Sequence, residues 1–493
     1  MLVLFCISLI IGSTFYYQLN FSLTEIYFLS ILWGVFFCLI FRNFKGILIG
    51  LILTLTVILG ALRIWMMPVH EIEIGNRALS GIVQSIDERL DKTLLIVKLD
   101  NSDGKVQVEL SHINNILPGD YISFRGQVKE PENFVTDSGR IFPYKQYLSS
   151  KGIDAIVNNA QIANIEFFRQ GLKNGEIRNY VVRYATITRS WIARQLSKNI
   201  SFPVDGIVSG MLVGFQGGIP KYLSDIFRVT GTLHTLVLSG YNITVLATFI
   251  GILLRRAQFK VRNILIFFGI FSLVLVSGAG IAAVRAGIMG SIALLATATL
   301  RTYNVFRALL FAFLFFFMTM PKAIFSDPGF HLSFLATLFI ITILPILKEK
   351  LIWIPNWKVN FRELSILSFG LPIFMLPYLM YFSGLFPIVS PIANMFLVPI
   401  IPLLMLGGLA VVVFSPITLL TNFFGTLTSF VGGFTINVLT FFGKLPQWQT
   451  PNLSGFGVLG IYSVLFVLIY KREIITYFAH LRNTFRIQTN SNF

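Results

Sequence analysis

The chain has 493 residues, of which 55% are hydrophobic and only 12% are charged. Charged residues make up about a quarter of an ordinary globular domain, so this composition excludes a soluble enzyme. The 80 residues from Leu364 to Gly443 contain no Asp, Glu, Lys or Arg, which is enough chain for three helical spans of about 20 residues each. We therefore expect a polytopic α-helical membrane protein.

The formal net charge is +17. A multi-span protein collects Lys and Arg in its short cytoplasmic loops, and this explains much of the excess, although nucleic-acid binding would also use it. The two cysteines, Cys6 and Cys38, lie in apolar stretches. The sequence therefore predicts neither a disulfide framework nor a cysteine-based metal site.

Residues 1–66 are expected to form three spans, the first of them retained, because no basic region or cleavage site flanks it. Apolar stretches predict about twelve spans in all, at 2–19, 26–41, 46–65, 232–254, 263–279, 281–300, 308–320, 329–347, 364–383, 389–412, 416–441 and 454–470. Cations gather at Arg42 and Lys45; at Arg255, Arg256, Lys260 and Arg262; at Arg301 and Arg307; at Lys348, Lys350, Lys358 and Arg362; and at Lys471 and Arg472. All five groups face the cytoplasm of a cell-membrane protein if both termini are cytoplasmic, which places residues 66–231 outside.

Residues 71–167 have the pattern of a small extracytoplasmic β-domain. Short strands are expected at 78–86, 93–99, 105–110, 121–129 and 154–162, and Asn101-Ser102-Asp103-Gly104 favours a hairpin between the second and third. Five short strands suit a closed barrel of the OB type, and another small β-barrel equally well. The segment has 10 basic and 14 acidic residues, which argues against DNA binding by the barrel alone.

Residues 168–231 connect the β-domain to the later spans. Apolar residues recur at helical spacing from 168 to 200 and cations occupy the other faces, which predicts a basic amphipathic helix in the membrane surface. Its arginines are expected to contact phosphates of anionic lipids or of DNA: Arg178, Arg183, Arg189 and Arg194. Residues 203–231 are too polar for a clean span and predict a re-entrant or interfacial segment.

Patterns typical of catalysis are absent from the sequence. The five histidines, at 70, 112, 234, 331 and 480, have no metal-ligand spacing, and there is no Gly-x-x-x-x-Gly-Lys-Ser/Thr loop to bind a nucleotide. The sequence therefore predicts no enzyme, no metal site and no cofactor. Directed transport would draw its driving force from a partner or a gradient.

Polar residues inside predicted spans are the candidate functional residues, because each is costly in a membrane. Arg285 is the clearest case, since it lies among Ala and Gly residues about one turn inside the outer end of its span. A structural ion pair is the alternative to a functional role. Asp205, Asp225 and Asp327 are the acids that could supply it.

Three further patterns break the apolar runs. The polar stretch 231–242 predicts either a transport path or a helix–helix contact. Asp327 before Pro328 is also what a capped helix start requires. A series of residues in the charge-free region predicts broken helices of the kind found in channels and carriers: Pro372, Pro377, Pro387, Pro391, Asn394, Pro399 and Pro402.

Five short motifs follow one another across some 300 residues. They are Pro118-Gly119-Asp120 with Phe142-Pro143-Tyr144; His234 with Ser239-Gly240-Tyr241-Asn242; Arg285-Ala286; Phe330-His331-Leu332-Ser333-Phe334; and Pro391 with Asn394 and Pro399. In this order they resemble the ComEC family, inner-membrane channels for DNA uptake in natural transformation. The family commonly has Ser-Gly-Leu-His at the position of residues 239–242. Many members also carry a C-terminal metallo-β-lactamase-like domain, whereas this sequence stops soon after its last predicted span.

The resemblance implies that residues 232–470 form a channel domain of about nine spans, followed by a short basic cytoplasmic tail at 471–493. It implies transport of single-stranded DNA into the cytoplasm. The expected path is lined by His234, Ser239, Asn242, Arg285, His331 and Ser333, with Asp225 and Arg228 nearby. The expected partners are the DNA strand, an outer DNA receptor, a separate nuclease, a cytoplasmic ATPase or helicase as motor, anionic lipids, and a second copy of the chain in a homo-oligomer. The alternative is a transporter or flippase of an anionic lipid or envelope polymer, which would use the same buried cations.

Overall fold

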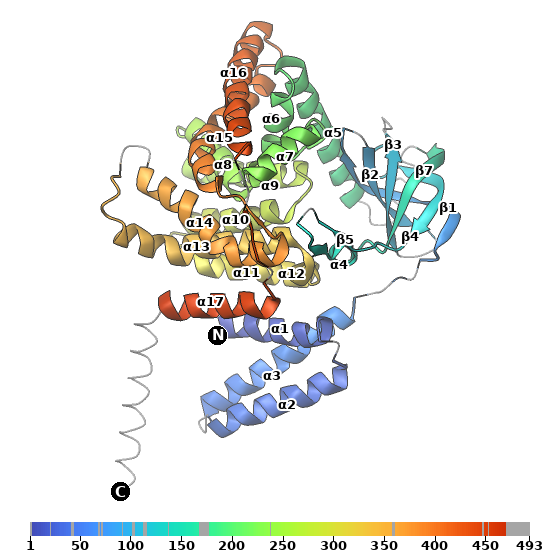
Figure 1. Cartoon of the computed structure of the whole chain (residues 1–493), viewed down its shortest axis with the longest axis vertical. Helices are drawn as coiled ribbons and strands as arrows, with labels where there is room; N and C mark the ends of the chain where they lie inside the picture. Colours follow the sequence, from blue (N-terminus) through green and yellow to red (C-terminus); the bar gives the residue numbers. More distant parts are fainter. Residues whose placement is uncertain are drawn as a thin grey trace.

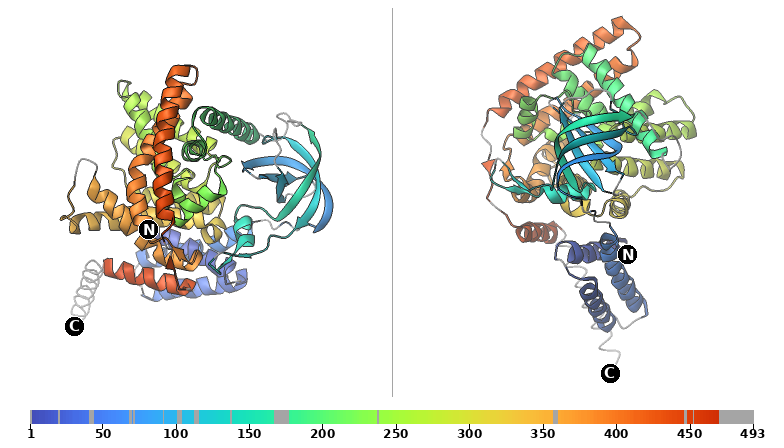
Figure 2. Two further views of the ribbon diagram at one scale, coloured as in Figure 1. Left: turned by 45° about the horizontal axis from the view of Figure 1, so that its top comes forward. Right: turned by 90° about the vertical axis from the view of Figure 1, so that its right-hand side faces the viewer.

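The computed structural model describes residues 2–469, apart from 20, 41–43, 68, 69, 71, 91, 101–103, 112–115, 137, 167–176, 237, 357–359, 446, 447 and 452. A β-barrel lies at one side of a larger helical part (Figure 1). The view from the barrel side shows the barrel in front of the helices (Figure 2). The predicted tail, His112, His480 and most of the predicted hairpin turn lie outside the described residues.

Five strands form a closed barrel, namely β1 (Gly75–Glu88), β2 (Lys92–Leu99), β3 (Lys105–Ser111), β4 (Tyr121–Lys129) and β7 (Ala155–Glu166). They follow the order β1-β2-β3-β7-β4, and β4 closes on β1; β3 and β7 run parallel. Val83, Leu95 and Val108 are among the alternating side chains that fill the interior. The arrangement is compatible with the expected OB-type barrel, and the predicted strands agree with these bounds to within four residues.

The connection between β4 and β7 contains an insert that leaves the barrel. It consists of a two-stranded hairpin, β5 (Phe134–Val135) and β6 (Ile141–Phe142), followed by α4 (Tyr144–Ser150). The insert contacts the helical part at α12 (Ala323–Ser326), where Nζ of Lys322 donates a hydrogen bond of 3.2 Å to Ser149 Oγ. The barrel is therefore attached through its own side branch.

Each of the twelve predicted spans contains a helix. They are α1 (Leu2–Tyr17), α2 (Leu23–Ile40), α3 (Phe44–Trp65), α8 (Gly240–Leu253), α9 (Phe259–Val276), α10 (Ile281–Ala298), α11 (Val305–Thr319), α13 (Pro328–Lys350), α14 (Phe361–Phe382), α15 (Ser390–Val413), α16 (Thr418–Gly443) and α17 (Gly455–Ile469). Seven stretches among the described residues are long and apolar enough to cross a membrane: Leu233–Leu253, α9, α10, α13, α14, α15 and α16. Shorter apolar helices include α1, α11 and α17, so a total of twelve spans stays a prediction.

The span predicted at 232–254 agrees with the apolar stretch Leu233–Leu253. Its α-helix begins only at Gly240, because a 3-10 turn, η1 (Leu233–Thr235), precedes it and Ser239 caps its first turn.

The expectation of helices broken at prolines is wrong for Pro372 and Pro377, which lie inside continuous α14. Such prolines are tolerated where neighbouring helices and local adjustments satisfy the freed backbone groups. Pro387 lies between α14 and α15, and Pro391 lies in the first turn of α15. Continuous α15 contains two further prolines and packs against both α14 and α16.

Three helices occupy the segment between the barrel and α8. α5 (Ile177–Asn199) lies between the barrel and the helical part (Figure 1). All ten residues of α6 (Val204–Val213) are buried, in a core shared with α5, α15 and α16, and α7 (Lys221–Val229) follows. Ile177, Tyr184 and Trp191 of α5 are exposed, as a helix lying in a membrane surface would present them. The surface and re-entrant placements of this segment stay predictions.

Candidate functional site

Arg285 lies in the first turns of α10 and reaches two neighbouring helices. Its Nη1 donates a hydrogen bond of 2.8 Å to the backbone carbonyl of Ser333 in α13. Its Nη2 lies beside Gly240, the first residue of α8, where a Cβ would come within 3.3 Å of it. Neither Nε of Arg285 nor Oγ of Ser333 has a hydrogen-bond partner among the described residues, and both atoms are buried. The structure thus brings together Arg285, Ser333 and the start of α8.

None of the three candidate acids forms an ion pair with Arg285. Asp225 pairs with Arg228 on α7, where 3.2 Å separate Oδ1 and Nη1 and both side chains are exposed. Asp327 caps α13 by accepting backbone N–H groups at its start, so the capping prediction is confirmed. Asp205 is buried in α6, and its Oδ1 has no hydrogen-bond partner in the described part of the chain. These acids therefore leave the charge of Arg285 uncompensated.

Ser239 and Asn242 hold the start of α8 in place. The hydroxyl of Ser239 accepts the backbone N–H of Asn242 at 3.4 Å and donates to Oδ1 of Asn242 at 3.2 Å. Asn242 is completely buried, and its Nδ2 donates to the carbonyl of Met211 in the last turn of α6 at 3.1 Å. His234 of η1 is exposed, although the adjacent Thr235 is buried. Asn242 therefore connects two helices, whereas His234 is accessible.

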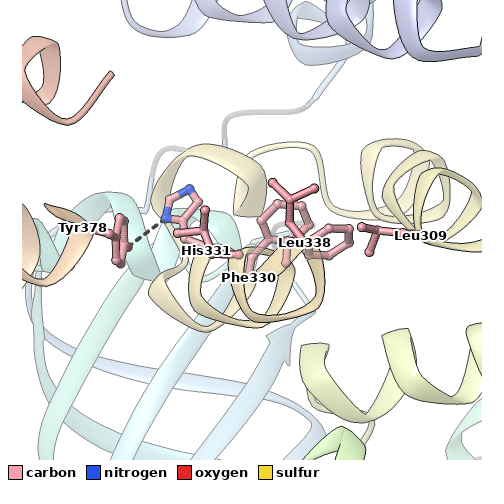
Figure 3. Close-up of a pocket in the computed structure, with 7 residues that line it drawn as sticks. Leu309, Phe330, His331, Leu338 and Tyr378 are labelled. Atoms are coloured by element: carbon pink, nitrogen blue, oxygen red, sulfur yellow. Dashed lines mark hydrogen bonds between the residues drawn. The ribbon is translucent and has the colours of Figure 1, made fainter. Parts of the chain in front are cut away.

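His331 and Tyr378 stand at one end of an apolar cavity between α11, α13 and α14 (Figure 3). The cavity has a volume of about 270 Å³, and its other walls are Leu309, Phe330, Phe334, Leu335 and Leu338. Nδ1 of His331 lies 2.9 Å from the Tyr378 hydroxyl, and Nε2 lies 2.6 Å from the carbonyl of Ile324. Because a carbonyl only accepts, Nε2 carries the proton and Nδ1 of the neutral ring accepts from Tyr378. Both ring nitrogens are thus occupied.

The four arginines of α5 divide into two pairs. Arg183 forms an ion pair of 2.6 Å with Asp120 of the barrel, and the side chain of Asp120 has no exposed surface. Arg189 donates to a backbone carbonyl of β1 at 3.0 Å, and burial lowers its pKa. Arg178 and Arg194 are exposed. Two of the four therefore bind the barrel, and phosphate contacts by this helix stay a prediction.

Two contacts carry no recognisable signal in the sequence, that of Tyr378 with His331 and that of Asp120 with Arg183. Tyr378 lies in a charge-free apolar run, where a tyrosine is unremarkable, and only the fold reveals that it contacts His331. Asp120 follows Pro118-Gly119 and has the sequence context of an ordinary turn residue. Its partner Arg183 lies 63 residues away. Nothing in local spacing could pair the two.

The site contains cationic and neutral hydrogen-bonding groups. Throughout the described part of the chain, no three His, Cys, Asp or Glu side chains gather where they could hold a metal ion. The arrangement around Arg285 can therefore bind an anion through hydrogen bonds and charge.

Comparison with known proteins identifies the helical part. Residues 211–474, more than half of the chain, match the model of a family described as Competence protein. ComE operon protein 3 of Bacillus subtilis (strain 168) is 24% identical over 298 residues, which are 59% of this chain and 35% of that relative. The aligned region thus spans about a third of the relative's length, and no solved structure matches. Because the matched region contains α8, α10 and α13 with Arg285 between them, the chain and its candidate site belong to the Competence protein family.

Proposed function

We propose that this chain passes a single DNA strand across the cytoplasmic membrane and that Arg285 contacts phosphate on the path. Membership of the Competence protein family supports a role in DNA uptake. The finer assignment rests on the guanidinium of Arg285, which lies inside the helical part and forms no ion pair with an acid among the residues that the structure describes. A cation in such surroundings is costly, so we expect it to serve a charged ligand.

Two positive groups meet at Arg285. The N-terminal end of a helix carries about half a positive charge, and α8 begins at Gly240 beside Nη2 of the guanidinium. A cation at this end of a helix is unfavourable unless an anion lies between the two. A phosphate oxygen would neutralise both groups and give the buried Nε a partner, and the hydroxyl of Ser333 would donate to the same anion.

The proposal assigns a role to each of the other residues predicted for the path. Because the hydrogen bonds of Asn242 and His331 are used within the protein, these side chains position α8 and α13. His234 is accessible and is proposed to contact the strand directly. Asp225 and Arg228 form an exposed pair on α7 and are proposed to lie at the edge of the path.

We propose that the protein is a channel and not an enzyme. We further propose that it lies in the cell membrane with its barrel outside. The sequence contains no nucleotide-binding loop, so a cytoplasmic ATPase or helicase is proposed as the motor. A receptor outside would deliver the DNA, and a separate nuclease would degrade the second strand. Anionic lipids and a second copy of the chain complete the proposed set of partners.

Replacement of Arg285 by Gln tests the proposal. Glutamine keeps a donor for the carbonyl of Ser333 but removes the charge, and a hydrogen bond to a charged group contributes about 1.5–3 kcal/mol. In a strain that lacks the native copy, we expect the variant to lower the transformation frequency about ten-fold or more. Arg256→Gln, in an exposed loop, is the matched control and should leave uptake unchanged. Normal uptake by Arg285→Gln, at equal protein level, would remove this residue from the mechanism.

Reconstituted vesicles separate DNA transport from the lipid-transport alternative. Vesicles that contain the protein receive labelled single-stranded DNA on one side and labelled anionic lipid in one leaflet. We expect protected DNA to accumulate while the lipid label keeps its distribution. Lipid movement without DNA entry would favour a flippase.

A further inference from the structure

A row of aromatic rings runs from the insert of the barrel into the helical part. Phe134 stacks on Phe142 with 5.1 Å between ring centroids, and Phe142 meets Phe382 of α14 edge-to-face at 5.5 Å. Phe382 stacks on Tyr378 at 5.8 Å, with the ring planes 7° apart. Tyr378 in turn lies 5.3 Å from the ring of His331. We call Phe134, Phe142, Phe382 and Tyr378 the aromatic ladder.

The ladder is held in place where the insert meets the end of α14. Arg140 donates to the backbone carbonyls of Tyr381, Thr450 and Pro451, at 3.2, 3.3 and 2.9 Å. Ser138 Oγ donates to the carbonyl of Ser383 at 2.5 Å. These bonds lie on either side of Phe382, so the hairpin and α14 keep their rings in register. The ladder therefore continues from one domain to the other.

The outer end of the ladder is accessible and the inner end is not. Phe134 is 49% exposed, whereas Tyr378 is 8% exposed and stands beside the cavity of His331. His331 and Ser333 lie in the first two turns of α13, and the carbonyl of Ser333 binds Arg285. The ladder thus begins at the surface and ends at α13, the helix whose Ser333 carbonyl accepts from Arg285.

The insert carries as many cations as acids. Residues 130–151 contain Arg140, Lys145 and Lys151 against Glu130, Glu132 and Asp137, and Lys145 forms an ion pair with Glu130. Nζ of Lys151 lies 4.3 Å from the ring centroid of Tyr147 in α4, next to these rings. Aromatic rings accompanied by cations are the recurring means by which proteins bind single-stranded nucleic acids without sequence preference.

We propose that the aromatic ladder stacks the bases of the incoming DNA strand and guides it from the barrel domain towards Arg285. This inference rests on the proposed function and names the part of the ligand that the ladder recognises, namely the bases rather than the phosphates. Every base has an aromatic face, so stacking tolerates any sequence. The ladder prefers unpaired strands, because bases within a duplex are already stacked on each other.

Binding measurements on the full-length protein in nanodiscs test the ladder without requiring transport. The probes are a single-stranded oligonucleotide and an abasic strand of equal length, which has the same phosphates but no bases. Phe134→Leu removes an accessible ring while keeping an apolar side chain, and Phe134→Tyr keeps the ring. Phe430→Leu is the control, since Phe430 is 75% exposed on α16 away from the ladder.

Loss of one stacked ring should weaken binding of the normal strand about five-fold or more. We expect this for Phe134→Leu and a larger loss for Phe134→Leu combined with Phe382→Leu, with no change in binding of the abasic strand. Phe134→Tyr and Phe430→Leu should bind both probes as the unaltered protein does. A 2-aminopurine base in the probe should lose fluorescence on the unaltered protein and recover it on the double variant.

Three outcomes would overturn the ladder. One is equal affinity of the unaltered protein for the normal and abasic strands. Another is unchanged binding of the normal strand by the double variant. The third is that Phe134→Leu binds the normal strand fully and only Phe134→Asp loses binding. That result would indicate that the hairpin is a lipid anchor. Uptake by Arg285→Gln tests the channel separately, so a failed ladder leaves that assignment standing.

Discussion

Arg183 of α5 donates a hydrogen bond of 2.6 Å to the carboxylate of Asp120, a barrel residue with no exposed surface. The same guanidinium binds the carbonyl of Pro118 at 3.2 Å, and Oδ2 of Asp120 accepts the backbone N–H of Leu117 at 2.8 Å. The turn before β4 is thus fixed to α5 by paired charges. Because α5 also packs against α6, α9 and α15, it joins the barrel to the helical part at a second place, in addition to the insert.

Replacement of Arg183 by Gln should loosen the barrel. Removing one partner of a buried ion pair leaves the other charge uncompensated and costs about 3–5 kcal/mol. We expect the lower end of this range, because the side chain of Arg183 is 18% exposed. Faster hydrogen exchange in β1 and β4 of the full-length protein would report the change. Arg194→Gln is the control, since Arg194 bonds only within its own helix turn among the contacts described; equal exchange in both variants would contradict the assignment.

Asn242→Leu should destabilise the contact between α6 and α8. The substitution leaves the carbonyl of Met211 buried without its donor, a loss of about 1–3 kcal/mol. Asn242→His introduces the residue common in the related ComEC motif and keeps a donor, so its effect should be smaller. Thermal unfolding of the solubilised protein measures both variants. A leucine variant as stable as the unaltered protein would show that the contact contributes nothing.

Tyr378→Phe separates the hydroxyl from the ring. Loss of the hydroxyl leaves Nδ1 of His331 without a donor beside an apolar cavity, so stability should fall by about 1–3 kcal/mol. Binding of single-stranded DNA should stay unchanged, because the ring remains in the aromatic ladder. Tyr378→Leu removes both groups and should lower stability and binding together. A loss of binding in the phenylalanine variant would show that the hydroxyl, and not the ring, contacts the strand.

Stability of the barrel should rise with pH because of Lys105. Burial, together with the nearby Arg178, lowers the pKa of Lys105 from about 10.4 in an unfolded chain. Between these two pKa values the unfolded state binds more protons than the folded state, so stability increases as the pH rises towards 10.4. Lys105→Met should stabilise the protein at neutral pH and remove this rise. Unfolding midpoints at pH values from neutral to alkaline measure it, with the exposed Lys129→Met as control.

Hydrophobic pattern alone predicts most of the elements. Apolar runs locate the helices, because a helix among apolar neighbours needs apolar side chains around its whole surface, and strict alternation locates the five strands. The start of α8 could not be found in this way. Residues 232–239 are apolar enough for a helix, but the cap at Ser239 sets the true beginning. Capping depends on one hydroxyl rather than on average hydropathy.

The candidate site was only partly predictable. The cost of a polar side chain in a span singles out both Arg285 and Ser333. Their contact could not be predicted, because the two residues lie 48 positions apart in the chain, on different helices. The aromatic ladder is a stronger example, because Phe134 and Tyr378 belong to different domains and neither is unusual in its own segment. Phenylalanine is abundant here, with 49 residues. Only the folded arrangement distinguishes the four rings that align.

The arginines that join the parts of this protein share one kind of hydrogen-bond acceptor. Arg140, Arg189 and Arg285 each donate to main-chain carbonyls of a distant segment. Every amino acid supplies such an oxygen, so the receiving positions are free to change identity during evolution while the arginine stays constrained. Pairs of correlated substitutions would not reveal these joints in an alignment. Diverged homologues can therefore keep the same architecture although few of the receiving side chains remain alike.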